Sequence, residues 1–248
     1  MSERIQIPVE EYKQRVKNAA AKIRERNLDV LVVNGSESDY ANTRYFSNFW
    51  PVFERCGVAI SASGECALMV GPESELFAAD FGVIEDVFVL YEYRESANPA
   101  YPELKPQKYS DVFKKIGVSG EKIRIGVAAW LDTNVVMMEG LKNTYPNAEI
   151  VRADDIMVEL RSIKSDNEIK CLREATRITQ LATDAVIQNI KPGMTELQLV
   201  GIAQNTIYAN GAEYEGLPMY CFSQKSTKHA ISRSSYKKIG RASCRERV

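Results

Sequence analysis

The chain has 248 residues, a hydrophobic fraction of 45%, and 32 basic against 33 acidic side chains. This length and apolar content predict one large or two medium packed domains. Because the charges nearly cancel, nothing in the composition favours nucleic acid or a membrane surface as a partner. No apolar run approaches the roughly 20 residues that span a bilayer, and Met1–Arg4 does not have the basic and then apolar pattern of a signal peptide.

The first part of the chain alternates helices and strands. Pro8 opens a helix over 8–26, whose apolar residues recur every three or four positions, and a buried strand over 28–33 is broken by Asn34-Gly35. The other expected elements are a helical turn and loop at 39–50, strands at 56–60 and 66–70 in a hairpin, a helix at 73–81, a strand at 87–91, a loop at 98–107, a helix at 110–117 capped by Ser110, a strand at 122–128, a helix at 133–145, a strand at 149–152 and a helix at 153–160. This order predicts an α/β domain, a mixed sheet with flanking helices.

Two long helices with clear start signals follow. Ser165 and Glu168 have the spacing of a capping box, and apolar positions continue from there to 188. Pro192-Gly193 ends that helix, and Thr195 with Gln198 forms a second capping box for a helix over 196–209. We therefore expect one domain at 1–160 and the start of another at 161–238.

Residues 239–248 differ from everything before them. The stretch is polar, has three arginines and lacks periodicity. It back-translates without a mismatch to ATC GGA AGA GCG TCG TGT AGG GAA AGA GTG, which matches a common short-read sequencing adapter. We expect this tail to be adapter-derived and not to pack against the chain before it, with the natural sequence ending near Lys238 or Ile239. The alternative is a native basic tail.

The five cysteines are odd in number and widely spaced, at positions 56, 66, 171, 221 and 244. They form no Cys-x-x-Cys pair, so the sequence indicates neither a zinc ribbon nor a disulfide framework. A reduced, cytoplasmic setting is the simplest interpretation.

The segment around the two capping boxes resembles a known family. Arg161-Ser162-Ile163-Lys164-Ser165, Leu172-Arg173-Glu174-Ala175 and Pro192-Gly193-Met194-Thr195-Glu196 are similar to the entry of the pita-bread domain in Xaa-Pro aminopeptidase, prolidase and creatinase. The resemblance implies a creatinase-like amino-terminal domain followed by the first helices of a truncated α+β pita-bread domain. It also implies that the amino-terminal domain supports the catalytic domain and forms a homodimer.

His229 is the only histidine, and it is the candidate catalytic residue. Its place after Glu213–Pro218 and before Arg233 is similar to that of the family's first histidine, which binds substrate and can shuttle protons. The match departs from the family at Ser223-Gln224, where a Ser-Gly is usual. Residues 230–233 (Ala-Ile-Ser-Arg) instead resemble a creatinase-like branch. The alternative is that His229 is an exposed polar loop residue.

Other candidate groups have simpler interpretations. Asp154-Asp155 are placed to start a helix, and Glu213 and Glu215 fit a solvated turn, so we assign no metal ligand in this chain. In the family's peptidases, two aspartates, a histidine and two glutamates that would lie beyond Lys238 hold two divalent ions, with Mn, Co or Zn possible. An aromatic cluster either packs in the core, which we expect, or lines a partner's active site as the family's loops can; its members are Tyr40, Tyr45, Phe46, Phe49 and Trp50.

Two functional hypotheses remain open. In the first, the longer protein is a hydrolase that cleaves a C–N bond in a peptide or small amide, and this chain alone is inactive and binds divalent metal weakly. In the second, it is a non-catalytic or metal-free family member that uses the same cleft as a binding module. The metal ligands beyond Lys238 discriminate between the two.

Overall fold

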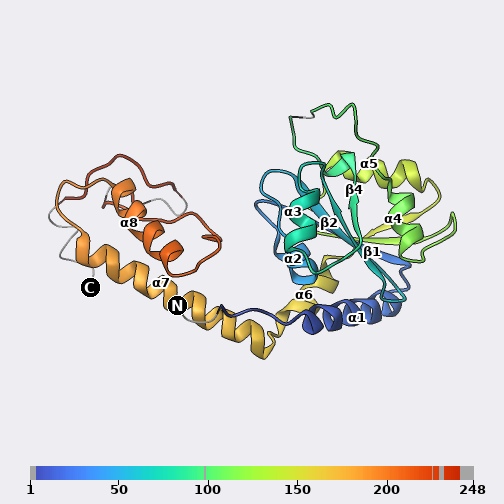
Figure 1. Ribbon diagram of the computed structural model, residues 1–248, viewed down its shortest axis with the longest axis horizontal. Helices are drawn as coiled ribbons and strands as arrows, with labels where there is room; N and C mark the ends of the chain where they lie inside the picture. The colour runs from blue at the N-terminus through green and yellow to red at the C-terminus, as the bar shows by residue number, and fades with distance from the viewer. Residues whose placement is uncertain (1–3, 98, 225, 229–231, 241–248) are drawn as a thin grey trace. The chain divides into compact units, whose positions relative to one another are not determined.

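The computed structural model of the protein describes residues 4–97, 99–224, 226–228 and 232–240 (Figure 1). The chain divides into two compact units, each with its own packed interior. The first unit is Pro8–Lys164. The second takes in the described residues from Ser165 onward, together with residues 4–7.

Six strands of the first unit form one mixed sheet, in the order β4-β3-β2-β1-β5-β6. The strands are β1 Val30–Ser36, β2 Arg55–Ser61, β3 Cys66–Val70, β4 Val87–Val89, β5 Arg124–Ala128 and β6 Glu149–Arg152. The β1–β2 and β2–β3 pairs are antiparallel, and the β3–β4, β1–β5 and β5–β6 pairs are parallel. The expected hairpin and the expected α/β class with a mixed sheet are both confirmed.

Helices cover both faces of this sheet (Figure 1). They are α1 Val9–Glu25, α2 Ala41–Ser47, α3 Glu75–Phe81, α4 Tyr109–Lys115, α5 Val135–Thr144 and α6 Asp154–Ser162, with a short 3-10 helix η1 at Tyr91–Tyr93. In β1, Leu31 and Val33 join a core with α1, α2 and α6, whereas Val30 and Val32 join a core with α4 and α5. Both sets are buried because neither face of the sheet is left to solvent.

Strand β1 does not end where its sequence suggests. Asn34-Gly35 was expected to break the strand, but β1 continues to Ser36, with Asn34 opposite Gly57 and Gly35 opposite Cys56 of β2. Glycine is needed here for close approach: a Cβ on Gly35 would lie 2.7 Å from Oγ1 of Thr43. The expected break is therefore wrong, because pairing with a distant strand overrides the local turn signal.

The start of α4 also differs from expectation. Ser110 was expected to cap this helix, but the helix begins one residue earlier, at Tyr109. The carboxylate of Asp111 accepts a hydrogen bond of 2.8 Å from the backbone N–H of Lys108. A side chain within the first turn thus satisfies the amide of the preceding residue, and Ser110 is not the cap.

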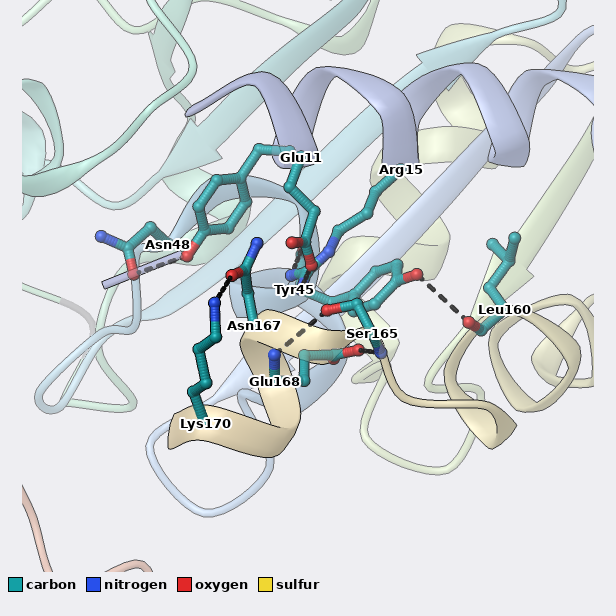
Figure 2. Close-up of polar contacts among 10 residues, drawn as sticks. Glu11, Arg15, Tyr45, Asn48, Leu160, Ser165, Asn167, Glu168 and Lys170 are labelled. Atoms are coloured by element: carbon teal, nitrogen blue, oxygen red, sulfur yellow. Dashed lines mark hydrogen bonds and ion pairs between the residues drawn. The ribbon is translucent and has the colours of Figure 1, made fainter. Parts of the chain in front are cut away.

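A buried arginine on α1 is neutralised inside the first unit (Figure 2). Arg15 donates to the Glu11 carboxylate at 2.6 Å and to the backbone oxygen of Tyr45 at 2.9 Å. Its guanidinium also lies 4.3 Å from the centre of the Tyr45 ring, and the Tyr45 hydroxyl donates to the backbone oxygen of Leu160 at 3.1 Å. These contacts offset the cost of burying the charge and join α1, α2 and α6.

The second unit contains two long helices, α7 Asp166–Asn189 and α8 Glu196–Ala209. Both expected capping boxes are present, on Ser165 with Glu168 and on Thr195 with Gln198. Figure 2 shows the first of them, with Ser165 Oγ accepting from the Glu168 N–H at 3.1 Å. The helices pack through a small apolar cluster of Ile178, Ala182, Ala203 and Ile207. No helix within the described residues is long and apolar enough to cross a membrane.

Loss of the first cap is expected to weaken α7. Ser165→Ala removes the oxygen that satisfies the Glu168 amide, and N-cap losses of this kind cost about 1 kcal/mol. Hydrogen exchange of the first-turn amides of α7 measures the effect. Ser162→Ala is the matched control, because its hydroxyl only donates to the Glu159 carbonyl at the end of α6. Equal protection in the two variants would contradict the prediction.

Candidate functional site

Residues 237–239, near the end of the described chain, pair with the backbone at the start of α8. The Glu196 N–H donates to the Lys237 carbonyl at 3.0 Å, and Thr195 forms a β-bridge with Lys238. Ile239 continues this pairing, since its N–H donates to the Met194 carbonyl at 2.7 Å and its carbonyl accepts from Gly193. Ile239 is also buried. The expectation that the chain after Lys238 does not pack is therefore wrong at Ile239, while residues 241–248 lie outside the described part.

The Glu196 carboxylate is fully buried at the centre of this arrangement. Its Oε1 accepts from the N–H and the hydroxyl of Ser223, at 2.8 and 2.7 Å. Its Oε2 accepts from the N–H and the hydroxyl of Ser235, both at 2.8 Å. We call these three residues the Glu196 clamp.

The clamp keeps Glu196 ionised. Burial alone would raise the pKa of Glu196, but hydrogen bonds from Ser223, Ser226 and Ser235 outweigh it and lower the pKa to about 2. The carboxylate also sits in the first turn of a helix, where the exposed amides favour negative charge. At neutral pH the clamp therefore holds a buried anion through neutral donors.

The predicted catalytic residue, His229, lies outside the described residues. The carboxylates that were interpreted as structural do have structural contacts. Asp154 opens α6 and accepts from the Trp130 N–H at 3.1 Å, and Asp155 pairs with Arg26. In the second unit, Glu213 pairs with Arg4, while Glu215 accepts from the Gln204 side chain and the Met219 N–H.

The aromatic cluster belongs mostly to the interior of the first unit. Phe46 and Phe49 are fully buried in the core that lies on the α1 side of the sheet. Tyr45 packs against the same core. The Arg44 guanidinium lies over the Trp50 ring, 3.9 Å from the centre of that ring. These contacts agree with the core interpretation.

The described residues do not fit a metal centre. Within those ranges, no group of three or more His, Cys, Asp or Glu side chains is placed to hold an ion. The Glu196 clamp offers one carboxylate, and both its oxygens are already taken up by serine donors. Two-metal sites need several carboxylate and imidazole ligands, which the described residues do not supply.

Sequence reasoning missed the role of Glu196. The residue lies inside the capping box Thr195–Gln198, and the local pattern accounts for it as an acidic first-turn residue. Its partners Ser223 and Ser235 are far along the chain and carry no motif of their own. Only the folded structure brings the three together.

The fold and the site describe a protein of two units. The first is an α/β domain with helices on both faces of one mixed sheet, and the second begins with two capped helices. The chain belongs to the creatinase/prolidase family: the model described as the Creatinase/Prolidase N-terminal domain matches residues 15–163, which is more than half of the chain. The model of Metallopeptidase family M24 matches residues 170–242. The resemblance inferred from the capping segments is thereby confirmed.

Similar curated proteins are longer than this chain. An Xaa-Pro dipeptidase from Pyrococcus horikoshii is 27% identical over 173 residues, which is 69% of this chain and 42% of that protein. An Xaa-Pro dipeptidase from Pyrococcus furiosus is 26% identical over 112 residues, 45% of this chain and 31% of that protein. The chain thus matches less than half the length of these relatives.

Solved structures share the fold. The prolidase from Pyrococcus furiosus aligns with a TM-score of 0.68 at 20% identity, covering 91% of this chain and 62% of that one. The X-Pro aminopeptidase from Thermotoga maritima aligns with a TM-score of 0.68 at 16% identity, covering 91% and 58%. The creatinase-like first unit and the opening helices of the second are therefore the family's fold.

Proposed function

We propose that this chain is part of a hydrolase that cleaves a C–N bond in a peptide, as an Xaa-Pro dipeptidase does. The observation that carries the proposal is the ordered match of two family models, the creatinase/prolidase domain and then the M24 metallopeptidase, along one chain. The 27% identity to an Xaa-Pro dipeptidase supports the same substrate class. The activity is proposed for a longer protein that contains this chain.

His229 is the proposed substrate-binding and proton-shuttling residue. Imidazole changes charge near neutral pH, which suits it to both roles. The M24 family is one of metallopeptidases, which implies divalent metal in its full-length members. Mn, Co or Zn are the proposed ions, held by ligands that would lie beyond Lys238 in the longer protein.

Two further features complete the proposal. The odd number and wide spacing of the cysteines in the sequence support a reduced, cytoplasmic setting. A homodimer through the first unit follows from the family resemblance. Exposed apolar side chains at Val52, Phe53 and Leu76 supply surface that such a contact could bury.

A second candidate is a creatinase-like hydrolase of a small amide, or a metal-free binding protein. Ser223-Gln224 and Ala230–Arg233 depart from the peptidase pattern, and these positions favour that branch. The gene sequence past the codon for Lys238 discriminates between the peptidase, the creatinase-like hydrolase and the binding protein. Two aspartates, a histidine and two glutamates there would support the peptidase. Their absence with retained catalytic histidines supports a creatinase-like enzyme, and the absence of both supports a binder.

The activity test uses the longer protein. Purified protein is assayed on Xaa-Pro dipeptides and on creatine, with added Mn, Co or Zn and with a chelator. We expect metal-dependent release of proline, and a loss of roughly 10²–10⁴-fold in kcat/KM for His229→Ala, the range that acid–base groups contribute. Hydrolysis of creatine alone, or binding without turnover, would reject the peptidase. An unchanged kcat/KM in His229→Ala would reject the residue's role.

A further inference from the structure

Glu54, in the first unit, is a buried carboxyl group whose hydrogen bonding is incomplete. The residue immediately precedes β2, and its exposed fraction is 1%. Its Oε1 accepts from the Glu73 N–H at 3.3 Å, which is long for a hydrogen bond of this kind. Its Oε2 is buried and finds no hydrogen-bond partner among the described residues. Buried polar atoms in proteins are nearly always hydrogen-bonded, so this oxygen is unusual.

The carboxyl group lies against the turn between β3 and α3. A Cβ on Gly71 would be 2.3 Å from the carboxyl carbon of Glu54, so the group packs directly on the Gly71 backbone. The turn is closed by the Ser74 N–H, which donates to the Gly71 carbonyl at 3.2 Å. Helix α3 begins at Glu75, directly after this turn. Glu54 therefore joins the start of β2 to the start of α3, and we call this contact the Glu54 junction.

The ionisable groups that the described structure places around the junction are acidic or phenolic. Glu73, in the turn, adds a like charge to Glu54. Tyr101, from the loop before α4, donates to Oε1 of Glu73 at 2.7 Å. The carboxyl groups of Glu73, Glu54 and Glu95 all raise the pKa of Tyr101, after the effect of its own burial. Tyr101 is therefore a neutral donor here and supplies no positive charge.

Ionising Glu54 in this place is costly. Burial raises the pKa of Glu54 above its ordinary value of 4.5, and the like charge of Glu73 adds to the increase. Hydrogen bonding from Ser74 and from the amides of the turn offsets only part of it. The cation next to Glu54 in the chain, Arg55, pairs instead with Asp132 at 3.5 Å. The neutral carboxyl is therefore the form that fits the folded junction.

We propose that Glu54 is a pH-sensitive switch, which holds the start of β2 against the turn 71–74 while its carboxyl is neutral and releases the turn when the carboxyl ionises. The ionised group either stays buried with too few hydrogen bonds or moves out to water, and moving out breaks the contact with Gly71. The folded state binds the proton more tightly than the unfolded chain, so the stability that Glu54 contributes is complete below pH 4.5. It is lost as the pH rises through the folded pKa.

Trp50 reports the state of the junction. Its ring lies 6.4 Å from the Phe77 ring on α3, centre to centre, so its emission responds to movement of the helix that follows the turn. The chain has two tryptophans, and Trp130→Phe leaves Trp50 as the single emitter. In this background the emission of the 248-residue chain is recorded from pH 4 to pH 9. We expect a transition with its midpoint above pH 4.5, and no such transition in Glu54→Gln, which keeps the shape of the side chain without its charge.

Two further variants in the same background separate the charges. Glu73→Gln removes the like charge and should move the midpoint down, by only a small amount because Glu73 is exposed and screened by water. Glu75→Gln is the matched control, because Glu75 is an exposed acid in the first turn of α3, and it should leave the midpoint unchanged. A wild-type midpoint at or below pH 4.5, or the same transition in Glu54→Gln, would overturn the proposal.

Hydrogen exchange gives a second readout that needs no tryptophan substitution. Between pH 4.5 and the raised pKa, the protection of the Glu73 and Ser74 amides, corrected for intrinsic rates, should fall by up to about tenfold per pH unit. In Glu54→Gln it should stay level. Protection in the wild type that does not change with pH would reject the switch. Neither readout involves turnover, so the switch can fail while the proposed peptidase activity stands, and the reverse.

Discussion

Replacing Gly57 by alanine is expected to destabilise the first unit by roughly 3 kcal/mol, the upper end of the range for overpacking a core. A Cβ at this position would lie 2.6 Å from the Tyr93 hydroxyl oxygen and 2.9 Å from its ring. Tyr93 is fully buried, its hydroxyl donates to Asn34 at 2.9 Å, and it accepts from Tyr109 at 3.2 Å. Gly57 lies on β2, between β1 and β3, so the backbone has little room to shift.

Chemical denaturation followed by tryptophan fluorescence measures this loss, because Trp50 and Trp130 both lie in the first unit. Gly201→Ala is the control: it lies in α8 of the second unit with nothing within 4 Å of the added methyl, so it should leave the fluorescence transition of the first unit unchanged. Tyr93→Phe removes the nearest clashing atom, so the double variant should lose less than the sum of the single changes. A Gly57→Ala protein as stable as wild type would show that the Tyr93 contact is not fixed.

Local signals in the sequence predicted much of the fold. Ser165 with Glu168, and Thr195 with Gln198, are short-range patterns whose bonds form within one helical turn, so the starts of α7 and α8 could be predicted. The strands over 56–60 and 66–70 joined as the expected hairpin for the same reason. In each case the residues that decide the structure are neighbours in the chain.

Long-range contacts decided the features that were missed. Gly35 is a turn signal by itself, and only its pairing with Cys56 keeps it in β1. Likewise the local pattern marks Glu196 only as an acidic residue in the first turn of α8. Its structural role comes from hydrogen bonds with Ser223 and Ser235, which lie much further along the chain. Neither partner can be identified from one sequence, because nothing local marks which residues will meet.

The stability of the second unit is expected to fall as the pH drops from about 4.5 toward 2. The pKa of Glu196 is lowered to about 2 by its serine donors, against an ordinary value of 4.5. Its stabilising contribution is therefore complete above pH 4.5, where the unfolded carboxyl is also ionised. It is lost as the pH falls through the folded pKa, because the unfolded chain binds the proton first. The hydrogen exchange of α8 amides, measured from pH 7 to pH 2 and corrected for intrinsic rates, follows this loss.

Glu196→Gln should remove most of this pH dependence. At pH 7 it should also destabilise the second unit by roughly 3 kcal/mol, because charge-assisted hydrogen bonds become neutral ones and the side-chain NH2 of the glutamine would face the Ser235 donors. Glu174→Gln is the control. The pKa of Glu174 is also lowered, by its hydrogen bond to Arg177, but that pair lies on an exposed helix face and salt screens it. High salt should flatten the pH dependence due to Glu174 and leave the part due to Glu196. If α8 protection in Glu196→Gln keeps the wild-type pH dependence, the buried carboxylate does not contribute the acid-sensitive stability assigned to it.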